Sequence, residues 1–396
     1  MWTNIVISLI ITVIGGLLVL YFSPYLQKYI EKQNALFRNN FFYSIEAINQ
    51  MARKHNFPHC ENSKYLKDTV LSEYYANVFT PITIDVSGER KTVLLPYKEE
   101  IDFIKTPDAS IYIDSLEVTK KFVLCPELEE ATDDLLTTFK HERNCTDDPH
   151  PRMASFHSIS SHQYECTIEE ATYYQQIRTN LTLDFPLYIK GIDGEVTTRS
   201  YDYSQYNRLP ELSESCLSNA IGVSAIWVMG DRGNRKIFLL PRKKKVGVFE
   251  TKLGIPSGNV EMPEGNHFKS NDLVEFLTLD IAREFAEETG LCGKNIDITK
   301  FSKKVPKPTM IEYMKITPLA FVRELLRGGK PQMFFLIETP DIPVRLLKKS
   351  FRKSLGTEEF DDSILTSASP SSETICNYIY AQKYLQKNLN TSFVAI

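Results

Sequence analysis

The stretch of sequence that decides the fold is REFAEETGL, residues 283–291. It ends a predicted helix that begins after Asn271 or Asp272, either of which can cap it, and that stops at Gly290. Apolar residues recur every four positions along this segment, as the buried face of an amphipathic helix requires. That apolar row consists of Leu273, Leu277, Ile281 and Phe285.

Three carboxylates share another face of the predicted helix. Glu284, Glu287 and Glu288 are separated by three and four residues, so they fall within a stripe about 100° wide. Such close like charges repel one another unless a cation lies between them, and hard oxygen ligands favour Mg²⁺ or Mn²⁺ over zinc. Arg283 is expected to hold Glu287, four residues later, in position. The pattern predicts metal-assisted attack of water on a phosphoanhydride, and the alternative is a solvated acidic face.

A turn-and-strand segment, IPSGNVEMPE, precedes the helix at residues 255–264. Gly258 permits close approach of the backbone, and Glu264 adds a fourth carboxylate. Together with residues 283–291, this segment resembles the Nudix superfamily, whose signature is G-x5-E-x7-R-E-U-x-E-E-x-G-U with U apolar. Residues 283–291 match the second half of the signature, and Gly258 and Glu264 match the first half at the right mutual spacing.

The Nudix resemblance covers about residues 217–345 and implies an α/β/α sandwich with a mixed sheet. It also implies divalent-metal-dependent hydrolysis of a nucleoside diphosphate linked to another moiety, with Mg²⁺ or Mn²⁺ as the cofactor. By that resemblance the metal ligands are Glu284, Glu287 and Glu288, the catalytic residues are Glu264, Arg283 and Glu287, and Gly258 approaches the ligand.

The spacing within the signature departs from the Nudix pattern. Eighteen residues, not seven, separate Glu264 from Arg283. A second register uses Glu275, which has the family spacing to Arg283, but it places Lys269 where glycine belongs. Because of this insertion, the alternative is a Nudix-like domain that binds a ligand without hydrolysing it. The candidates for the general base are Glu264, Glu312 and Glu338.

Strands on either side of the signature complete the expected sheet. An apolar β-rich run at 220–229 and a second strand at 236–240 predict a hairpin, and further strands are expected at 314–325 and 331–338. The basic run RKKK at 242–245 follows the second strand. Arg242 and Lys244 are therefore candidates for contacting a phosphorylated ligand, and the alternative is a solvated turn.

The first residues predict a membrane anchor. From Ile5 to Phe22 the chain carries no charge, which is close to the roughly 20 apolar residues that span a bilayer. Lys28, Lys32 and Arg38 follow this run, so the positive-inside rule places the rest of the chain in the cytoplasm. We therefore expect a single-pass protein, in a bacterial inner membrane. The Gly15-Gly16 pair lets a second helix approach, so a homo-oligomer is one arrangement that the sequence allows.

Length and composition bound the remaining possibilities. A chain of 396 residues exceeds one ordinary domain, and a formal net charge of −4 gives no general attraction for duplex nucleic acid. Seven scattered cysteines without a CxxC pair indicate reduced thiols. His141, Cys145 and His150 lie close together in sequence, but no second ligand pair has zinc-site spacing, and the flanking Asp147-Asp148-Pro149 predicts a polar loop.

The predicted organisation divides the chain into five parts. These are a transmembrane anchor at 1–23, a helical stalk at 24–56, an α+β sensor or spacer at 57–210, the Nudix-like domain at 217–345 and a helical extension at 346–396. Within the third part we expect a strand hairpin at 82–95, an acidic helix at 127–139, a polar loop at 144–161 and a helix at 168–178. A last helix is expected at 375–386.

Two stretches before the signature indicate a narrower group. Residues 171–184 and 212–226 look like the region that precedes the Nudix domain in bacterial proteins associated with cyclic-oligonucleotide (CD-NTase) anti-phage systems. That resemblance implies a second function: an antiviral effector whose Nudix fold binds a nucleotide or cyclic oligonucleotide messenger and acts at the membrane.

Overall fold

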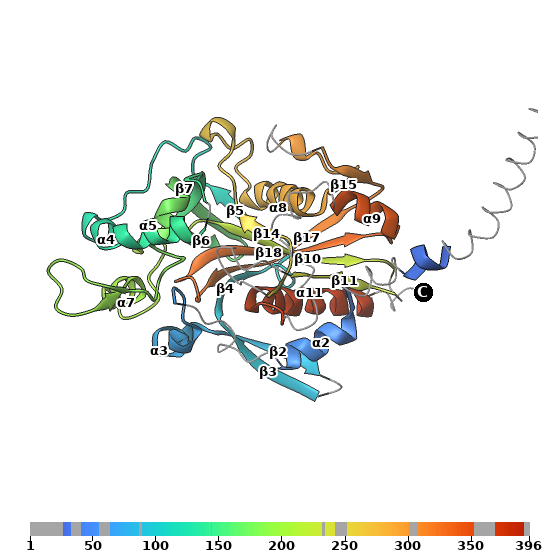
Figure 1. Cartoon of the computed structure of the whole chain (residues 1–396), viewed down its shortest axis with the longest axis horizontal. Coiled ribbons are helices and arrows are strands. Elements are labelled where there is room, and N and C mark those ends of the chain that lie inside the picture. Colours follow the sequence, from blue (N-terminus) through green and yellow to red (C-terminus); the bar gives the residue numbers. More distant parts are fainter. Residues whose placement is uncertain are drawn as a thin grey trace, which may run out of the picture.

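The computed structural model has a mixed β-sheet at its centre, with helices packed on both faces (Figure 1). It describes residues 27–32, 41–54, 64–86, 89–143, 145–231, 234–241, 252–300, 307–351 and 369–391. The expected α/β class is therefore confirmed.

The central sheet has seven strands in the order β1-β11-β10-β18-β17-β4, and β14 also pairs with β10. β10 and β18 run parallel, whereas the other neighbouring strands are antiparallel. The strands are β1 (Phe42–Ser44), β4 (Tyr97–Asp102), β10 (Gly222–Met229), β11 (Lys236–Phe238), β14 (Ser257–Asn259), β17 (Lys315–Glu324) and β18 (Lys330–Thr339).

The strands expected on either side of the signature are present. β10 and β11 pair antiparallel with Trp227 opposite Phe238, so the predicted hairpin is confirmed. β17 and β18 correspond to the strands predicted at 314–325 and 331–338, and they also pair antiparallel. Gly328 and Gly329 lie between them with φ values of 69° and 82°, a conformation that side chains disfavour.

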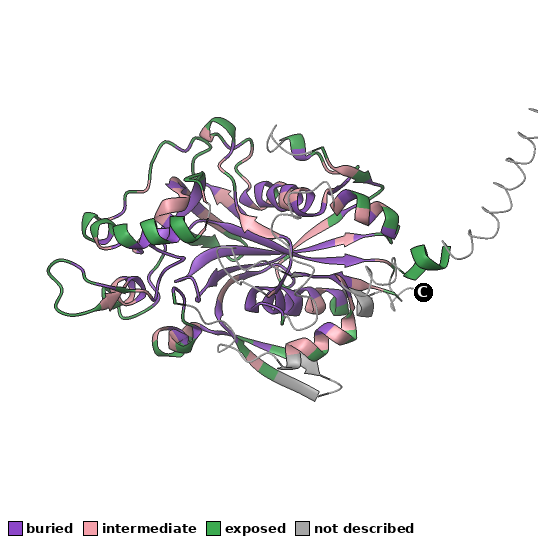
Figure 2. Cartoon of the chain, viewed as in Figure 1, coloured by how far each residue is buried: buried purple, intermediate pink, exposed green. Residues whose placement is uncertain are grey.

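Alternate residues of β10 face the two helical layers. Trp227 points toward helix α8 (Leu273–Thr289), where its ring centroid lies 4.9 Å from that of Phe285. Ile226 and Val228 point the other way and pack in the cluster that contains helix α11 (Ser372–Thr391). Figure 2 shows the central strands buried, which explains their nearly continuous apolar sequence.

Helix α8 begins and ends where its sequence predicts. The Asp272 carboxylate caps it by accepting hydrogen bonds from the backbone N–H groups of Val274 at 2.8 Å and Glu275 at 3.4 Å. Gly290, with φ of 71°, ends it. Helix α9 (Val344–Phe351) packs beside α8, and the short parallel pair β15 (Leu291–Gly293) and β16 (Thr309–Ile311) continues the chain there.

Helix α11 covers the opposite face of the sheet. Ile375 and Tyr380 are fully buried, and Asn377 donates a hydrogen bond to the carbonyl oxygen of Ser224 on β10 at 2.9 Å. The expected last helix is confirmed and is longer than predicted. It is a layer of the sandwich and not an appended extension, because its apolar residues lie in the same core as the central strands.

Segments predicted as a separate stalk and spacer contribute strands to the same sheet. β1 interrupts the predicted stalk and pairs with β11, and β4 pairs with β17 at the other edge. Helix α2 (Ile45–Lys54) then packs Ile48 against the α11 layer. Of the helical stalk predicted at 24–56, residues 27–32 and α2 are helical, whereas Phe42–Ser44 form an edge strand of the central sheet.

A second sheet, in the order β5-β7-β6, lies beside α8 and corrects two expectations. The segment predicted as a polar loop is mostly strand β6 (Pro149–Ser160), and the first half of the helix predicted at 168–178 belongs to strand β7 (Gln163–Thr172). Only α6 (Tyr173–Arg178) is helical. Prolines and serines are tolerated because β6 is an edge strand. β5 spans Ser110–Ile113.

The remaining elements are short. The predicted hairpin at 82–95 is confirmed as β2 (Thr80–Val86) and β3 (Glu89–Leu95), whereas the acidic helix is divided at Thr132 into α4 (Pro126–Ala131) and α5 (Asp133–Glu142). The others are α3 (Leu71–Tyr75), β8 (Pro186–Leu187), β9 (Val196–Thr197), α7 (Thr198–Ser204), β12 (Leu240–Pro241), β13 (Leu253–Gly254) and 3-10 turns at Asp68–Val70, Ala76–Val78, Glu264–Asn266 and Ile298–Lys300.

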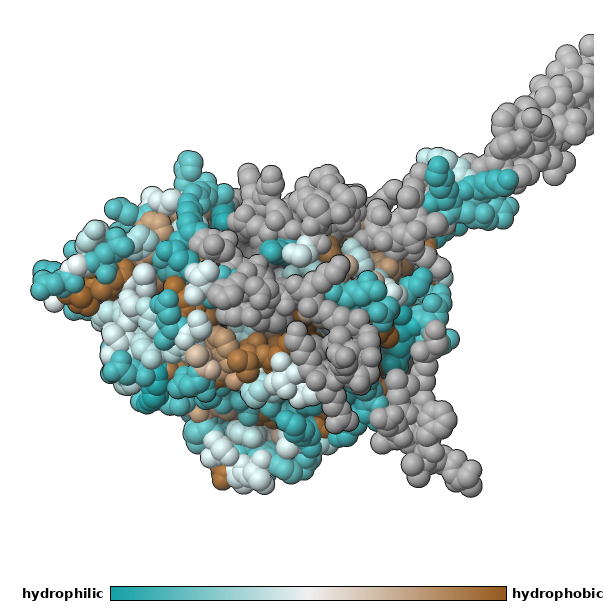
Figure 3. All heavy atoms as spheres, turned by 90° about the horizontal axis from the view of Figure 1, so that it is seen from below, coloured by the Kyte–Doolittle hydropathy of each residue, from teal (hydrophilic) through white to brown (hydrophobic). Residues whose placement is uncertain are grey.

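The predicted membrane anchor at 1–23 lies outside the described residues. Within the part of the chain that the structure describes, no helix is long and apolar enough to cross a membrane. On the face shown in Figure 3, hydrophilic and apolar side chains are interspersed. Val123 and Tyr188 are two large apolar residues that are exposed, and both lie in loops.

Candidate functional site

The acidic face of α8 packs against strand β14. β14 is fixed to the sheet by its pairing with β10, where Gly258 lies opposite Val223. A Cβ atom on Gly258 would lie 2.1 Å from Oε1 of Glu284, so only glycine leaves room for that carboxylate. The signature glycine therefore allows α8 to place an acidic side chain directly against the sheet.

Arg283 lies at the centre of the acidic cluster and is almost fully buried. Its guanidinium donates hydrogen bonds to Oδ1 of Asp280 at 3.0 Å, Oε1 of Glu284 at 2.7 Å and Oε2 of Glu287 at 2.8 Å. Glu261 lies 3.5 Å away as a fourth partner. The expected contact between Arg283 and Glu287 is present, and this arginine fixes the positions of several carboxylates at once.

The carboxylates outnumber the positive charge that holds them. Burial, together with the negative charges of Glu284 and Glu261, raises the pKa of Glu287 to about 7 against the opposing effect of Arg283. Burial likewise raises the pKa of Asp280 to about 7 against the effect of Arg283. Burial lowers the pKa of Arg283, but the surrounding carboxylates outweigh this and raise it. The cluster would therefore be stabilised by further positive charge.

Glu288 completes the trio from the same face of α8. It is buried, and its Oε1 accepts a hydrogen bond from the backbone N–H of Ser257 at 3.4 Å. This contact joins the C-terminal end of α8 to the start of β14. Glu284 and Glu288 thus both lie against the backbone of β14, and Glu287 lies between Arg283 and the solvent side.

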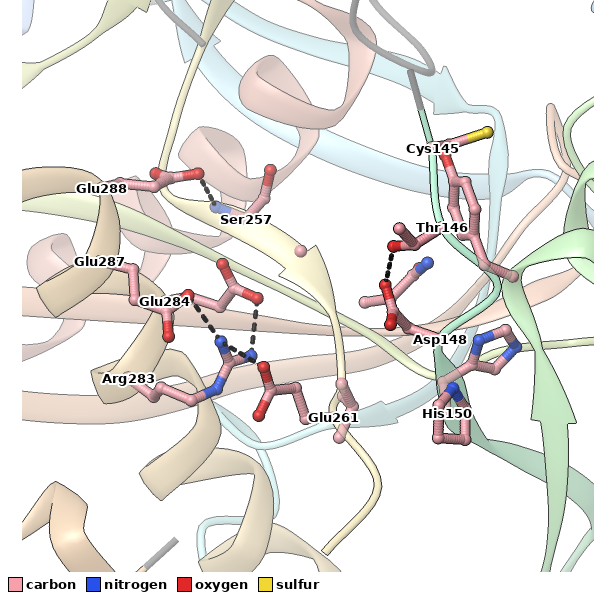
Figure 4. Close-up of a pocket in the computed structure, with 15 residues that line it drawn as sticks. Cys145, Thr146, Asp148, His150, Ser257, Glu261, Arg283, Glu284, Glu287 and Glu288 are labelled. Atoms are coloured by element: carbon pink, nitrogen blue, oxygen red, sulfur yellow. Dashed lines mark hydrogen bonds and ion pairs between the residues drawn. The ribbon is translucent and has the colours of Figure 1, made fainter. Parts of the chain in front are cut away.

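These side chains line an open pocket of about 500 Å³, a volume suited to a small ligand. In Figure 4, the glutamates of α8 lie on one side of β14, and Thr146, Asp148 and His150 lie on the other. The second wall also includes Cys145 and Tyr173. It comes from the region predicted as a sensor or spacer, so that region contributes directly to the site.

Of the predicted site residues, the structure brings Gly258, Arg283, Glu284, Glu287 and Glu288 together at the pocket. Glu264 is not among them, because it lies on the exposed 3-10 turn that occupies part of the insertion. Glu275, Glu312 and Glu338 also lie outside the pocket lining. Arg242 and Lys244 lie outside the described residues.

Sequence reasoning missed Glu261, Asp148 and His150. Glu261 occupies the pocket rim where Glu264 was expected, because the chain turns away from α8 at Pro263 before it reaches Glu264. Its position as the first carboxylate after Gly258 could have identified Glu261 from the sequence. Asp148 and His150 were assigned to a loop, and their approach to α8 depends on the pairing of β6 with β7, which is not encoded locally.

Glu284, Glu287 and Glu288 all line the pocket, and carboxylate oxygens are the ligands that hard divalent cations prefer. As their side chains lie, however, Arg283 engages Glu284 and Glu287. Among the described residues, no set of three or more acidic, histidine or cysteine side chains is already arranged around one metal position. Metal binding would therefore require these two glutamates to exchange contacts with Arg283.

Comparison with known proteins gives little further information. No family model matches the chain. A curated relative, Protein LpfD of Salmonella typhimurium (strain LT2), is 26% identical over 171 residues, which is 38% of this chain and 46% of LpfD. The match thus spans less than half the length of that relative, and it does not establish a family.

Proposed function

We propose that this chain is a Nudix-type pyrophosphohydrolase that uses Mg²⁺ or Mn²⁺ to cleave a nucleoside diphosphate linked to another moiety. The observation that carries the proposal is the placement of Glu284, Glu287 and Glu288 along one wall of a pocket, against a glycine that leaves room for the first of them. The glutamates of the signature and its glycine therefore line the same pocket.

The charge of the pocket supports a cation-dependent activity. Its described lining holds the carboxylates of Asp148, Glu261, Glu284, Glu287 and Glu288, against the guanidinium of Arg283. A phosphoanhydride carries negative charge and would be repelled by such a lining. A divalent cation held by the α8 glutamates would reverse this repulsion where the phosphates lie.

When bound, the cation supplies neutralisation of phosphate charge and Lewis acidity. The chain's own residues do the positioning. Arg283 orients Glu284 and Glu287 through hydrogen bonds of 2.7 and 2.8 Å. Glu261, at the pocket rim and half exposed, is the best placed carboxylate to accept a proton from an attacking water.

The test uses the full chain in detergent, incubated with Mg²⁺ or Mn²⁺ and a panel of nucleoside diphosphate derivatives. We expect phosphoanhydride cleavage that falls by about a hundredfold or more in Glu287→Gln and in Glu288→Gln. Glu130→Gln, on the exposed surface of α4, is the matched control and should retain the activity. Cleavage that survives both pocket substitutions, or the lack of any cleavage with both metals, would contradict the proposal.

A second candidate is the messenger-binding effector, in which the pocket binds a nucleotide or cyclic oligonucleotide without turnover and acts at the membrane through the predicted anchor. Two observations favour it. Arg283 already forms ion pairs with Glu284 and Glu287, and the opposite wall comes from the region before the signature. Tight binding of a cyclic oligonucleotide that needs no metal and is unchanged in Glu288→Gln would favour this candidate over hydrolysis.

A further inference from the structure

The wall of the pocket opposite α8 has a chemical character of its own. It is formed by residues 145, 146 and 148–150 and by Tyr173, and it faces the glutamates across β14 (Figure 4). Among the described residues this wall contributes a carboxylate, a hydroxyl, a thiol, an imidazole and a phenol, but no lysine or arginine. A phosphate group would find no positive charge there.

The histidine of this wall does not supply positive charge either. Burial, with a smaller contribution from the nearby charge of Lys330, lowers the pKa of His150 to about 3. At neutral pH its ring is therefore uncharged, and Nε2 lies 3.3 Å from the hydroxyl of Ser218. The moiety bound here must carry no negative charge and must offer hydrogen-bond donors, because the Asp148 carboxylate supplies only acceptor oxygens.

Asp148 is available to such a ligand. Its Oδ2 accepts a hydrogen bond from the Thr146 hydroxyl, while Oδ1 has no partner among the described residues. The backbone around it is held in place, because Tyr173 N–H donates to the Asp148 carbonyl at 3.0 Å and Tyr174 N–H donates to Asp147 Oδ1 at 2.8 Å. The carboxylate thus faces the pocket from a fixed position.

The floor between the two walls is fixed as well. Asn259 of β14 and Gln176 of α6 exchange hydrogen bonds of 2.6 and 3.2 Å through their side-chain amides. β14 is therefore tied both to the central sheet and to the region that carries Asp148. A ligand whose phosphates lie at the α8 glutamates would place its other end against the opposite wall. This wall is held in place by hydrogen bonds and offers the Asp148 carboxylate as a hydrogen-bond acceptor.

We propose that this wall binds the base of a guanine nucleotide, with Asp148 accepting hydrogen bonds from the adjacent N1–H and N2–H groups, and that it thereby sets the substrate class of the site. The inference rests on the proposed function, which places the phosphates of the nucleotide at the α8 glutamates. Guanine offers two neighbouring donors on one edge, which match one carboxylate, and Tyr173 adds an aromatic ring to the same wall. Hypoxanthine lacks the N2 amino group, and adenine presents only one donor group on that edge.

The experiment measures binding of GDP, IDP and ADP to the full chain by calorimetry in the presence of Mg²⁺, together with phosphate release from each. We expect GDP to bind about tenfold or more tightly than IDP and ADP. In Asp148→Ala the preference should fall to within about twofold, while Asp193→Ala, an exposed loop carboxylate outside the pocket, keeps it. Thermal melting of both variants verifies that they fold.

The results of this experiment distinguish a failure of the guanine-binding inference from a failure of the proposed hydrolase activity. A guanine preference that depends on Asp148, without any hydrolysis of a diphosphate-linked substrate, would retain the inference and overturn the hydrolase. Hydrolysis without a base preference, or with one that survives Asp148→Ala, would overturn the inference alone. The lack of binding to any of the three nucleotides also overturns the inference.

Discussion

Gly258 and Gly290 lie on either side of the acidic helix and are required for different reasons. At Gly258 an added Cβ would meet the end of the Glu284 side chain, 2.1 Å away. At Gly290 it would meet the backbone oxygen of Ser350 at 2.5 Å, and the residue also has φ of 71°. A flexible carboxylate can move, whereas the backbone of α9 cannot do so without loss of packing.

The two glycines therefore give a matched pair of predictions. Gly258→Ala should displace Glu284 and weaken metal-dependent activity by about tenfold or more, while the free energy of unfolding changes by less than about 1 kcal/mol. Gly290→Ala should lower the free energy of unfolding by about 1–3 kcal/mol. Urea unfolding followed by circular dichroism, with activity assays alongside, checks both. A Gly258→Ala variant with full activity would show that the position of Glu284 is not critical.

Lys330 is fully buried near Arg327, Glu324 and Glu373, and its Nζ donates to Gln332 at 3.2 Å. Burial and the charge of Arg327 together lower its pKa to about 7, against the opposing effect of the two glutamates. Between pH 7 and the unfolded-state pKa of about 10.4, the unfolded chain binds the additional proton. The contribution of Lys330 to stability must therefore rise with pH in this window.

Replacement of Lys330 by methionine removes this titration. We expect the free energy of unfolding of the natural chain, relative to Lys330→Met, to increase from pH 7 to pH 9 by at most about 1.4 kcal/mol per pH unit. Because the replacement also changes the charge near Glu324, Arg327 and Glu373, the sign of the pH dependence, and not its size, is the test. A difference that stays constant or falls as the pH rises would show that Lys330 keeps its charge when buried.

At the scale of single elements, α8 was predictable because its signals are local. The apolar row, the Asp272 cap and the Gly290 stop all lie within the helix or next to it, and each has the expected structural role. β6 was not predictable for the opposite reason. Its prolines and serines are typical of a loop, and only pairing with β7 along an edge makes the segment a strand.

The cap of α8 gives a prediction at this scale. Asp272→Ala removes the acceptor for the Val274 backbone N–H and should lower the free energy of unfolding by about 1 kcal/mol. Asp272→Asn keeps an acceptor oxygen and should be close to the natural chain. Thermal unfolding of the two variants compares them directly. Equal destabilisation in both would indicate that the carboxylate acts through its charge and not as a cap.

At the scale of the whole molecule, the sandwich is assembled from segments that are far apart in the chain. β1, β4 and α11 all contribute to the central sheet or its cover, although each lies outside the predicted Nudix-like segment. Local patterns could give their secondary structure, but not their partners. The same limit applies to the site, where one wall was predicted from the signature and the other depends on long-range strand pairing.

A buried ion pair connects these distant segments. Arg199 donates to both oxygens of Asp184 at 2.7 and 2.8 Å and to the carbonyl oxygens of Leu325 and Leu326 at 2.8 Å each. It thereby ties α7 to the turn after β17. Burial opposes the charge of Arg199, but Asp184 outweighs this and raises its pKa.

Arg199→Ala should therefore lower the free energy of unfolding by about 3–5 kcal/mol, because it removes the charged partner of the buried Asp184 carboxylate and the guanidinium bonds to two carbonyl groups. Arg208→Ala breaks an exposed pair with Glu214, of 2.8 Å, and should change the free energy of unfolding far less than Arg199→Ala does. Urea unfolding measures both effects. Similar small losses in the two variants would show that Arg199 does not connect the two parts of the chain.

The claim that the α8 glutamates hold a divalent cation is tested most directly by the binding of Mn²⁺ to the full chain, measured by electron paramagnetic resonance. The claim predicts a Mn²⁺ site that weakens by about tenfold or more in Glu287→Gln and in Glu288→Gln, remains in Glu130→Gln and is displaced by Mg²⁺. A chain that does not bind Mn²⁺, or binds it equally well in all three variants, would contradict it and would show that Arg283 is the permanent counter-charge of the acidic cluster.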